Sequence, residues 1–404
     1  MPADRARSGG RGPSRGLAAD APEASSPVRH EPPFVGSRSD AGAIQSAIRP
    51  VRQMGLASAT RDARPPRGYR RAGILARATR LALLAVILAA FGAAPASAQG
   101  KRVKVGVLKL SSSAPIFLGV ERGTFQEFGI EPELVYFQAA QPVAVAIAAG
   151  EIEVGATGLT AGLYNIVAGG EKVWVVADKG REWPGYPLTA LLVQTDGPVR
   201  SVRDLKGRKV GITQLGSTFH YMLGNLLELE ALSLSDVEVT PLRTLGAMAE
   251  ALQARRVDAI LIPQPFAGDA VEKGFGRILF WVGDKLPYQV AAIFYSKAFA
   301  RDRERAVAFM KGYVKAARLF FDATFAKKGG WDEVVALTAR YTGATPEAIR
   351  LGFPYQDRDG RLDVADIGRQ LDWYQKAGMV TAPLQVRDLV DTSFLEEALR
   401  ALPR

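Results

Sequence analysis

The sequence contains no cysteine, and this absence excludes several classes of site. Such a chain forms no disulfide bond, offers no thiolate metal ligand and has no cysteine nucleophile. It also cannot carry a lipid on an N-terminal cysteine, so after export we expect it to be freely soluble. Histidine is nearly absent as well, because His30 and His220 are the whole complement. With no HxxxH pair and no cluster of histidine and carboxylate residues, the sequence predicts no metal site and no cofactor.

The short motifs of common enzyme classes are also missing. The sequence has no GxSxG, no GxxxxGK[ST] and no GxGxxG placed after a strand. Catalysis usually needs a general base or an activated nucleophile, and neither His220 nor any lysine or carboxylate has a partner that the pattern identifies. The sequence therefore favours a binding protein over an enzyme.

Positive charge is concentrated at one end of the chain. Residues 1–98 hold fifteen arginines and six acidic residues, whereas the remainder holds 37 basic and 35 acidic residues. The net charge of +11 therefore belongs mainly to the N-terminal segment and does not indicate a nucleic-acid partner.

Residues 66–98 have the three parts of a secretory signal peptide. A basic region contains the pair Arg70-Arg71, an uncharged apolar run extends over 81–94, and Ala96-Ser97-Ala98 forms a small-x-small cleavage site. The run is shorter than the roughly 20 residues of a membrane-spanning helix. We therefore expect cleavage after Ala98 and a periplasmic mature protein, with either general or twin-arginine export. Residues 1–65 are rich in Ala, Gly, Pro, Ser and Arg, which predicts a disordered leader, and Met54 is an alternative start of translation.

Strand and helix patterns alternate along the first part of the mature chain. Strands are expected at 101–108, 133–137, 153–156, 172–177, 188–194, 209–213, 238–241, 257–262 and 289–295. Helices are expected between them, and after residue 296 only helices are expected, at 303–325, 331–340, 346–351, 363–377 and 394–402. Repeated strand–helix units predict mostly parallel sheets covered by helices. Two such cycles followed by a helical tail indicate two lobes, with the tail returning to the first lobe.

Small polar residues follow the expected strands at the sheet edge where open α/β sheets bind ligands. The sharpest of these segments is Gly216-Ser217-Thr218, which leads into an expected helix. Helix N-termini offer free N–H groups and partial positive charge to an anion, although Ser217 also suits a simple capping role. His220, one turn further on, fits either a structural or a pocket role. Trp183 and Tyr186 fall in a loop expected between the lobes and could add apolar walls.

Several segments, taken in their order and spacing from about Lys101 to the C-terminus, resemble a known family. They are 114–115, 123–125, 129–130, 149–155, 204–207, 216–220, 236–237, 251–259, 372–374, 378 and 391–395. This set resembles the NMT1/THI5-like solute-binding proteins, whose members serve nitrate, sulfonate, taurine and pyrimidine importers. Many sulfonate-type members have Trp and Pro where this chain has Leu261–Pro265, which leaves the ligand class open.

The resemblance implies an α/β fold of the type II periplasmic-binding-protein kind. Its lobe 1 would comprise 99–190 and 296–404, with the helical tail on it, and its lobe 2 would comprise 191–295. A small, anionic organic solute would be captured between the lobes and delivered to an ABC permease and ATPase complex by a monomeric protein. The implied pocket residues are Ser113, Ala114, Gln138, Thr157, Gly158, Gly216, Ser217, Thr218, His220 and Gln264, with Trp183 and Tyr186 as a lid.

Two other functions stay open at this point. One is a pyrimidine-forming enzyme that uses His220, although the relatives with that activity carry a cysteine-rich motif that is missing here. The other is a periplasmic ligand sensor, which would share the same fold.

Overall fold

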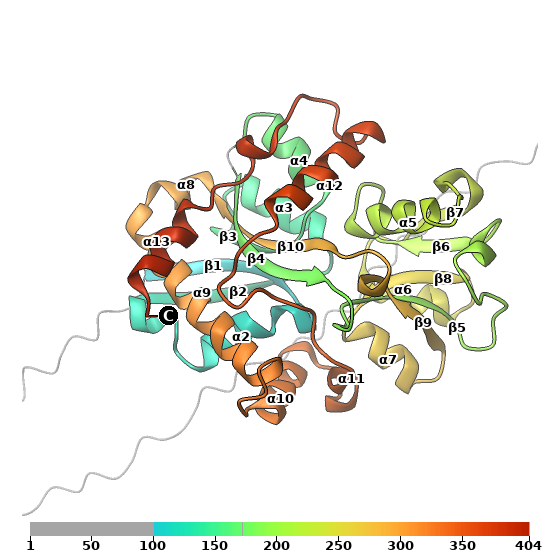
Figure 1. Cartoon of the computed structure of the whole chain (residues 1–404), viewed down its shortest axis with the longest axis horizontal. Coiled ribbons are helices and arrows are strands. Elements are labelled where there is room, and N and C mark those ends of the chain that lie inside the picture. Colours follow the sequence, from blue (N-terminus) through green and yellow to red (C-terminus); the bar gives the residue numbers. More distant parts are fainter. Residues whose placement is uncertain (1–100, 172, 404) are drawn as a thin grey trace, which may run out of the picture. The chain divides into compact units, whose positions relative to one another are not determined.

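The computed structural model describes residues 101–171 and 173–403, which belong to one unit of the chain (Figure 1). The predictions of a disordered leader, a signal peptide and a cleavage site all fall outside these residues. Within them the alternation of strands and helices, followed by helices alone, is as expected. Two five-stranded sheets organise the fold, and each defines one lobe.

The first sheet has the strand order β2-β1-β3-β10-β4. Its strands are β1 (Lys101–Leu108), β2 (Ile130–Phe137), β3 (Val154–Gly158), β4 (Val173–Glu182) and β10 (Tyr288–Ser296). β1 pairs in parallel with β2 and β3, whereas β10 runs antiparallel to both β3 and β4. Four of the five strands therefore point the same way. β10 is buried along its whole length, which explains why its sequence is apolar without alternation.

The second sheet repeats this plan with the order β7-β6-β8-β5-β9. Its strands are β5 (Thr189–Gln194), β6 (Lys209–Ile212), β7 (Glu238–Pro241), β8 (Ala259–Pro263) and β9 (Gly276–Trp281). β6 pairs in parallel with β7 and β8, and β5 is antiparallel to β8 and β9. Each lobe is thus a mostly parallel sheet with one reversed strand. The reversed strands, β5 and β10, are the strands by which the chain enters each lobe from the other.

Sheet pairing corrects one of the expected lobe boundaries. The chain first crosses between β4 and β5, close to the expected boundary after residue 190. It crosses back between β9 and β10, so β10 belongs to the first sheet, whereas residues 191–295 were expected to form lobe 2. The apolar run of β10 predicts a buried strand but carries no information about which sheet completes its hydrogen bonds.

Helices cover both sheets. Lobe 1 carries α2 (Ala114–Glu121), α3 (Ala140–Ala148) and α4 (Ala161–Ala168), and lobe 2 carries α5 (Thr218–Glu228), α6 (Leu245–Gln253) and α7 (Phe266–Glu272). The tail comprises α8 (Lys297–Arg301), α9 (Arg303–Thr324), α10 (Trp331–Thr342), α11 (Pro346–Arg350), α12 (Val364–Lys376) and α13 (Ser393–Ala401). The sequence pattern missed α7, α8 and β9, because the two helices are short and β9 is only half-buried.

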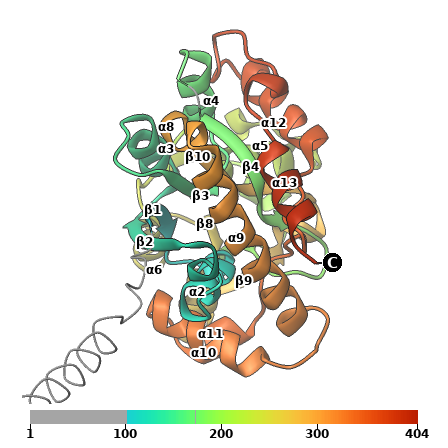
Figure 2. The same ribbon diagram turned by 90° about the vertical axis from the view of Figure 1, so that its left-hand side faces the viewer.

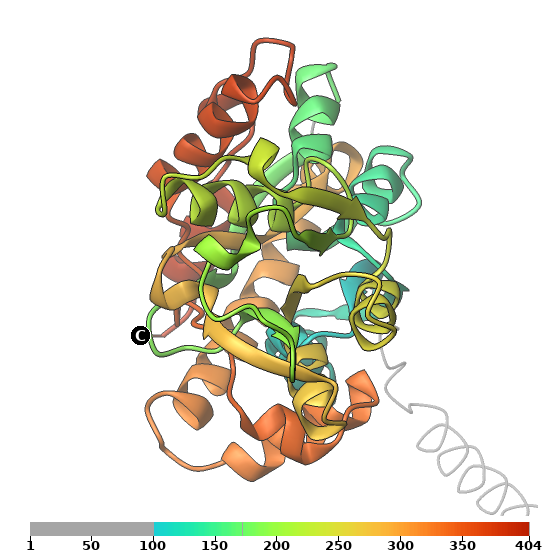
Figure 3. The ribbon, with the colours of Figure 1, turned by 90° about the vertical axis from the view of Figure 1, so that its right-hand side faces the viewer.

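The tail packs on lobe 1 as expected, and it also contacts lobe 2. Figure 2 shows α9 running between α2 and α13 over the first lobe. In Figure 3, which faces the second lobe, the orange part of the tail lies below that lobe. There α11 packs against α7, and α12 packs against α5 as well as α4 and β10. The tail therefore bridges the two lobes.

Asp178 of β4 forms hydrogen bonds with β10 and with the tail. Its carboxylate accepts hydrogen bonds from Gly180 N (2.9 Å), Gln289 Nε2 (2.5 Å) and Asp357 N (2.7 Å). Gln289, on β10, donates its backbone N–H to Asp366 at the start of α12 (2.7 Å). Burial of polar groups is tolerated only when they are paired in this way. This network fixes β4, β10 and the tail relative to one another.

No helix of residues 101–171 and 173–403 combines the length and the apolar character needed to cross a membrane.

The contact between α7 and α11 yields a testable prediction. A Cβ added at Gly268 would come within 2.8 Å of the carbonyl oxygen of Ala348, whereas a Cβ at Gly246 in α6 would meet nothing within 4 Å. We expect Gly268→Ala to lower the free energy of unfolding by about 1–3 kcal/mol because the backbone must shift, and Gly246→Ala to be neutral or slightly stabilising. Urea unfolding measures both. Equal stability of the two variants would contradict the close approach of the tail to lobe 2.

Candidate ligand-binding site

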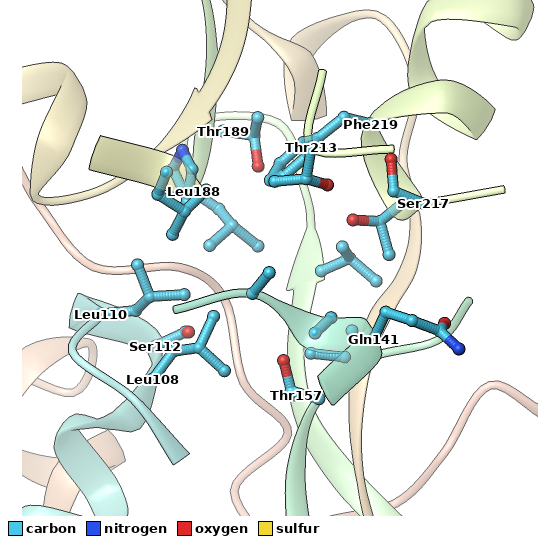
Figure 4. Close-up of a pocket in the computed structure, with 18 of the residues that line it drawn as sticks. Leu108, Leu110, Ser112, Gln141, Thr157, Leu188, Thr189, Thr213, Ser217 and Phe219 are labelled. Atoms are coloured by element: carbon cyan, nitrogen blue, oxygen red, sulfur yellow. The ribbon is translucent and has the colours of Figure 1, made fainter. Parts of the chain in front are cut away.

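A cavity lies between the two sheets and is lined by residues of both lobes (Figure 4). It contains about 610 Å³ of space free of atoms, part of which is open to solvent. Figure 4 shows Ser112 and Ser217 on opposite sides of it, with Thr189 and Thr213 above and Thr157 below. Apolar side chains, including Leu108, Leu110, Leu188, Phe219 and Leu245, fill the spaces between these polar groups. The cavity therefore suits a small molecule with an apolar body and polar ends.

The N-terminus of α5 faces this cavity from lobe 2. Ser217 is its N-cap, and the Ser217 hydroxyl oxygen accepts a hydrogen bond from His220 N (3.3 Å). Among the described residues, the backbone N–H groups of Thr218 and Phe219 have no acceptor. Both residues line the cavity. Ser217 thus caps the helix and, together with two free N–H groups, presents donors to a bound anion.

His220 supports this helix end but does not line the cavity. Its Nδ1 accepts a hydrogen bond from the backbone N–H of Gly216 (3.1 Å), and its ring meets Trp373 of α12 edge-on. Burial lowers the pKa of His220 below its usual value, so the neutral ring that this hydrogen bond requires is favoured. Gly216 adopts a positive φ of 75°, which a glycine tolerates at no steric cost. The structural role of His220, one of the two interpretations of the sequence, is the one that these contacts support.

Lobe 1 contributes Thr157 and Gly158 from the end of β3. A Cβ at Gly158 would lie 2.7 Å from Cγ2 of Thr218, so the glycine permits the two lobes to touch. Ala161 N donates to Gly216 O (2.9 Å) and Ser111 N donates to Gln264 O (3.1 Å), both across the boundary between the lobes. The lobes are therefore in direct contact around the cavity.

Lys179 is the one charged side chain that lines the cavity among the described residues. It follows Asp178 on β4, is 2% exposed, and donates from Nζ to the hydroxyl of Ser112 (2.7 Å). Burial lowers the pKa of Lys179 to about 7, while the charge of Asp178 opposes this shift. Lys179 was not among the site residues predicted from the sequence. The available signal was a lysine at the carboxyl end of the apolar run 173–177.

Hydroxyl groups, which can both donate and accept hydrogen bonds, are the commonest polar groups of this cavity. The hydroxyl groups of Thr157, Thr213 and Thr218 have no hydrogen-bond partner among the described residues. No Asp or Glu side chain of the described residues lines the cavity. These hydroxyl groups are available to a solute, and an oxyanion could accept hydrogen bonds from several of them at once.

Four other predicted site residues lie outside the lining. Ser113 donates its hydroxyl to Leu108 O (2.9 Å), and Ala114 is fully buried in the core of lobe 1. Gln138 is exposed. Gln264 is fully buried, and its Oε1 accepts from Gly268 N (3.1 Å). Each is one or two residues from a lining residue, Ser112, Ala139 or Pro263 among them, so the predicted loops border the cavity while these four side chains do not line it.

Trp183 and Tyr186 were expected to form a lid, but neither lines the cavity. The ring of Trp183 packs on Tyr355 with centroids 5.6 Å apart, and Tyr186 packs on Tyr355 and Phe325 of the tail. This loop thus attaches the first crossing to the tail. Of the twelve predicted site residues, the structure brings Thr157, Gly158, Ser217 and Thr218 to the cavity, with Gly216 adjacent.

Glu182, the last residue of β4, is an unusual feature next to the cavity residue Thr189. Its carboxylate is fully buried, and neither oxygen has a hydrogen-bond partner. It lies opposite Tyr288 of β10, whose hydroxyl also has none. Burial raises the pKa of Glu182 to about 8, with Thr189 opposing the shift. The side chain is therefore neutral at pH 7.

No group of three or more His, Asp or Glu residues that could hold a metal ion occurs in the part of the chain that the structure describes.

Fold and cavity together define a two-lobed α/β chain of the type II periplasmic-binding-protein kind. The sequence profile of the NMT1-like family matches residues 96–329, which is more than half of the chain. The chain belongs to this family.

Two curated relatives match about half of the chain. A protein of Escherichia coli (strain K12) named for the binding of aliphatic sulfonates is 30% identical over 217 residues, which is 53% of this chain and 63% of that protein. A protein of Brachyspira hyodysenteriae (strain ATCC 49526 / WA1), named as an ABC transporter periplasmic binding protein, is 24% identical over 234 residues, 54% of this chain and 65% of that one. The chain thus matches less than two thirds of the length of each.

Solved structures share the fold at lower identity. The alkanesulfonate-binding protein SsuA from Xanthomonas axonopodis pv. citri, bound to MOPS, aligns with a TM-score of 0.59 at 20% identity, over 72% of this chain and 98% of that one. The desulfurization enzyme DSZB aligns with a TM-score of 0.53 at 18% identity, over 74% and 99%. The fold is therefore used both for binding and for catalysis, and function must be argued from the site.

The buried carboxyl group of Glu182 predicts a pH dependence of stability. Between pH 4.5 and about 8 the folded protein holds a proton that the unfolded chain releases, so this contribution to stability is full at low pH and is lost as the pH rises through about 8. Relative to Glu182→Gln, the free energy of unfolding of the wild type should fall between pH 5 and 7 by up to about 1.4 kcal/mol per pH unit.

Denaturant unfolding at several pH values measures this difference, and Glu131→Gln is the control because Glu131 is exposed. Parallel pH curves for the wild type and Glu182→Gln would contradict the assignment.

Proposed function

We propose that this chain is the solute-binding protein of an ABC importer and captures a small organic anion between its two lobes. The observation that carries the proposal is a cavity between the lobes that is lined by several hydroxyl groups, one lysine and a helix N-terminus, with no lining carboxylate among the described residues. Donors fixed by a helix N-terminus and strand ends need no rearrangement to receive an oxyanion, which favours affinity. The apolar side chains beside them suit a short hydrocarbon portion of the solute.

The comparisons support the same class of solute. The curated relative from E. coli is named for aliphatic sulfonates, and the SsuA structure contains MOPS. A sulfonate or a carboxylate on a short apolar chain is accordingly the class we propose. Delivery to a permease and ATPase complex and a periplasmic location are further parts of the proposal, supported by the relatives named for periplasmic binding and ABC transport. Cleavage behind Ala98 and a monomeric state complete the proposal.

The enzymatic alternative receives less support from the site. It would use His220, but this ring accepts a hydrogen bond from Gly216 N and does not line the cavity. No histidine or carboxylate lies in the described lining, and its one titratable side chain, Lys179, already donates to Ser112. Capture without chemical change is therefore the function we propose, whether the captured solute is transported or sensed.

A thermal-shift screen tests the proposed class of ligand. The probes are propane-1-sulfonate, butanoate, nitrate and a pyrimidine, each compared with a neutral amide of matched size. An anion present at 100 times its dissociation constant should add about 2.7 kcal/mol to the free energy of unfolding. Stabilisation by the sulfonate or carboxylate but not by the amides is the expected result, and no response to any anion would overturn the proposal.

Ser217→Ala tests the role of the α5 N-terminus. Loss of a hydroxyl that donates to a charged group should weaken binding of propane-1-sulfonate by about 1.5–3 kcal/mol, measured by titration calorimetry. Ser296→Ala is a matched control, because Ser296 caps α8 through the same contact, with Phe299 N at 3.3 Å, and does not line the cavity. Both variants should lose similar stability. Equal affinities for the anion would leave Ser217 as a cap only.

A further inference from the structure

Lys179 is a buried lysine at the cavity, and its hydrogen-bond donors are only partly used. Its Nζ carries three N–H donors when charged, and one of them is used by the hydroxyl of Ser112. The side chain is almost fully buried against the cavity. A buried charge is costly unless it is paired, and within the described lining no carboxylate is present to pair with it.

The neighbouring Asp178 is already committed elsewhere. Its two oxygens accept hydrogen bonds from Gly180, Gln289 and Asp357. The carboxylate also forms an ion pair with Arg181. The carboxylate of Asp178 faces this network, whereas Lys179 lies at an irregularity in the pairing of β4 with β10 and lines the cavity. The remaining donors of Lys179 are therefore available to a solute.

We propose that Lys179 is the counter-charge for the anionic group of the solute, and that capture of the anion draws a proton onto this side chain. The inference rests on the proposed function and deepens it, because it identifies the charge that selects the solute. It places the anionic group beside Lys179 and Ser112 in lobe 1. The other oxygens of the same anionic group would meet the N-terminus of α5 in lobe 2.

The coupling to protons follows from the state of the unliganded side chain. Burial lowers the pKa of Lys179 to about 7, so the amine is increasingly neutral above that pH. A bound anion favours the ammonium form and raises the pKa. Among the described residues, Asp178 is the one titratable group that acts on Lys179, and the described groups that share the lining with it, Ser112 and Thr189 among them, are uncharged.

Titration calorimetry between pH 6 and pH 9 tests the inference, with propane-1-sulfonate and butanoate as probes and butanamide as the neutral match. For the wild type we expect a nearly constant affinity at the lowest pH and a fall towards about tenfold per pH unit above pH 7. Measurements in two buffers of different ionisation enthalpy should show proton uptake approaching one per anion at high pH.

Two variants separate charge from packing. Lys179→Met keeps the length of the side chain and should bind the anions at least about tenfold more weakly at pH 6, with no pH dependence. Lys179→Arg keeps a charge that does not titrate in this range, so its affinity should exceed that of Lys179→Met and should not depend on pH. Lys179→Met removes a buried charge that has no carboxylate in the described lining to pair with it. In the absence of a bound anion, the variant should therefore unfold at the same temperature as the wild type or at a higher one.

The outcomes are distinguishable. Anion binding by Lys179→Met with wild-type affinity or wild-type pH dependence would overturn the role of Lys179 and leave the proposed function standing. Failure of the wild type to bind either anion would overturn the proposed function, and this inference with it. If Lys179→Met does not fold, the pH dependence and proton uptake of the wild type, compared with Lys179→Arg, still decide the question.

Discussion

The carboxylate of Asp178 is the contact on which the arrangement of the site depends. It receives hydrogen bonds from its own strand, from Gln289 on the returning strand β10, and from the backbone of Asp357 in the tail. β4 and β10 lie beside the two points at which the chain crosses between lobes. The next residue, Lys179, lies at an irregularity in the pairing of β4 with β10 and lines the cavity. Of these two adjacent residues, Asp178 holds the strands and the tail together, and Lys179 lines the cavity.

Contact between the lobes completes the cavity. Gly158 and Gly216 allow the backbones to approach, since a side chain at either position would collide with Thr218 or Ala161. Backbone hydrogen bonds join the lobes, and α11 and α12 of the tail bridge them from outside. A solute held in this conformation is largely removed from water, which strengthens each charge-assisted hydrogen bond that it makes. Release then requires the lobes to separate, as in hinge motions of other two-lobed proteins.

The sequence predicted the elements well and the site only in part. Periodicity predicted β1 with its observed bounds and α9 to within one residue, because long or strongly alternating segments carry their own signal. It missed α7 and β9, and it placed β10 in the wrong lobe, because partner strands are chosen by tertiary pairing.

The same limit explains the site residues. Polar loops at strand ends were recognised, but whether Ser112 or Ser113 turns inward depends on the backbone of a single helical turn. Lys179 could not be predicted as a site residue because its role depends on its burial, and the sequence does not show that a particular lysine is buried. Its positive charge is available to a solute because no carboxylate of the described residues lines the cavity.

A crystal structure of the protein grown with propane-1-sulfonate tests the central claim most directly. The account predicts the anion in the cavity between the lobes, with its sulfonate oxygens within hydrogen-bond distance of Lys179 Nζ and of donors at the N-terminus of α5. An anion bound outside the cavity, or within it but away from both Lys179 and the N-terminus of α5, would contradict the account.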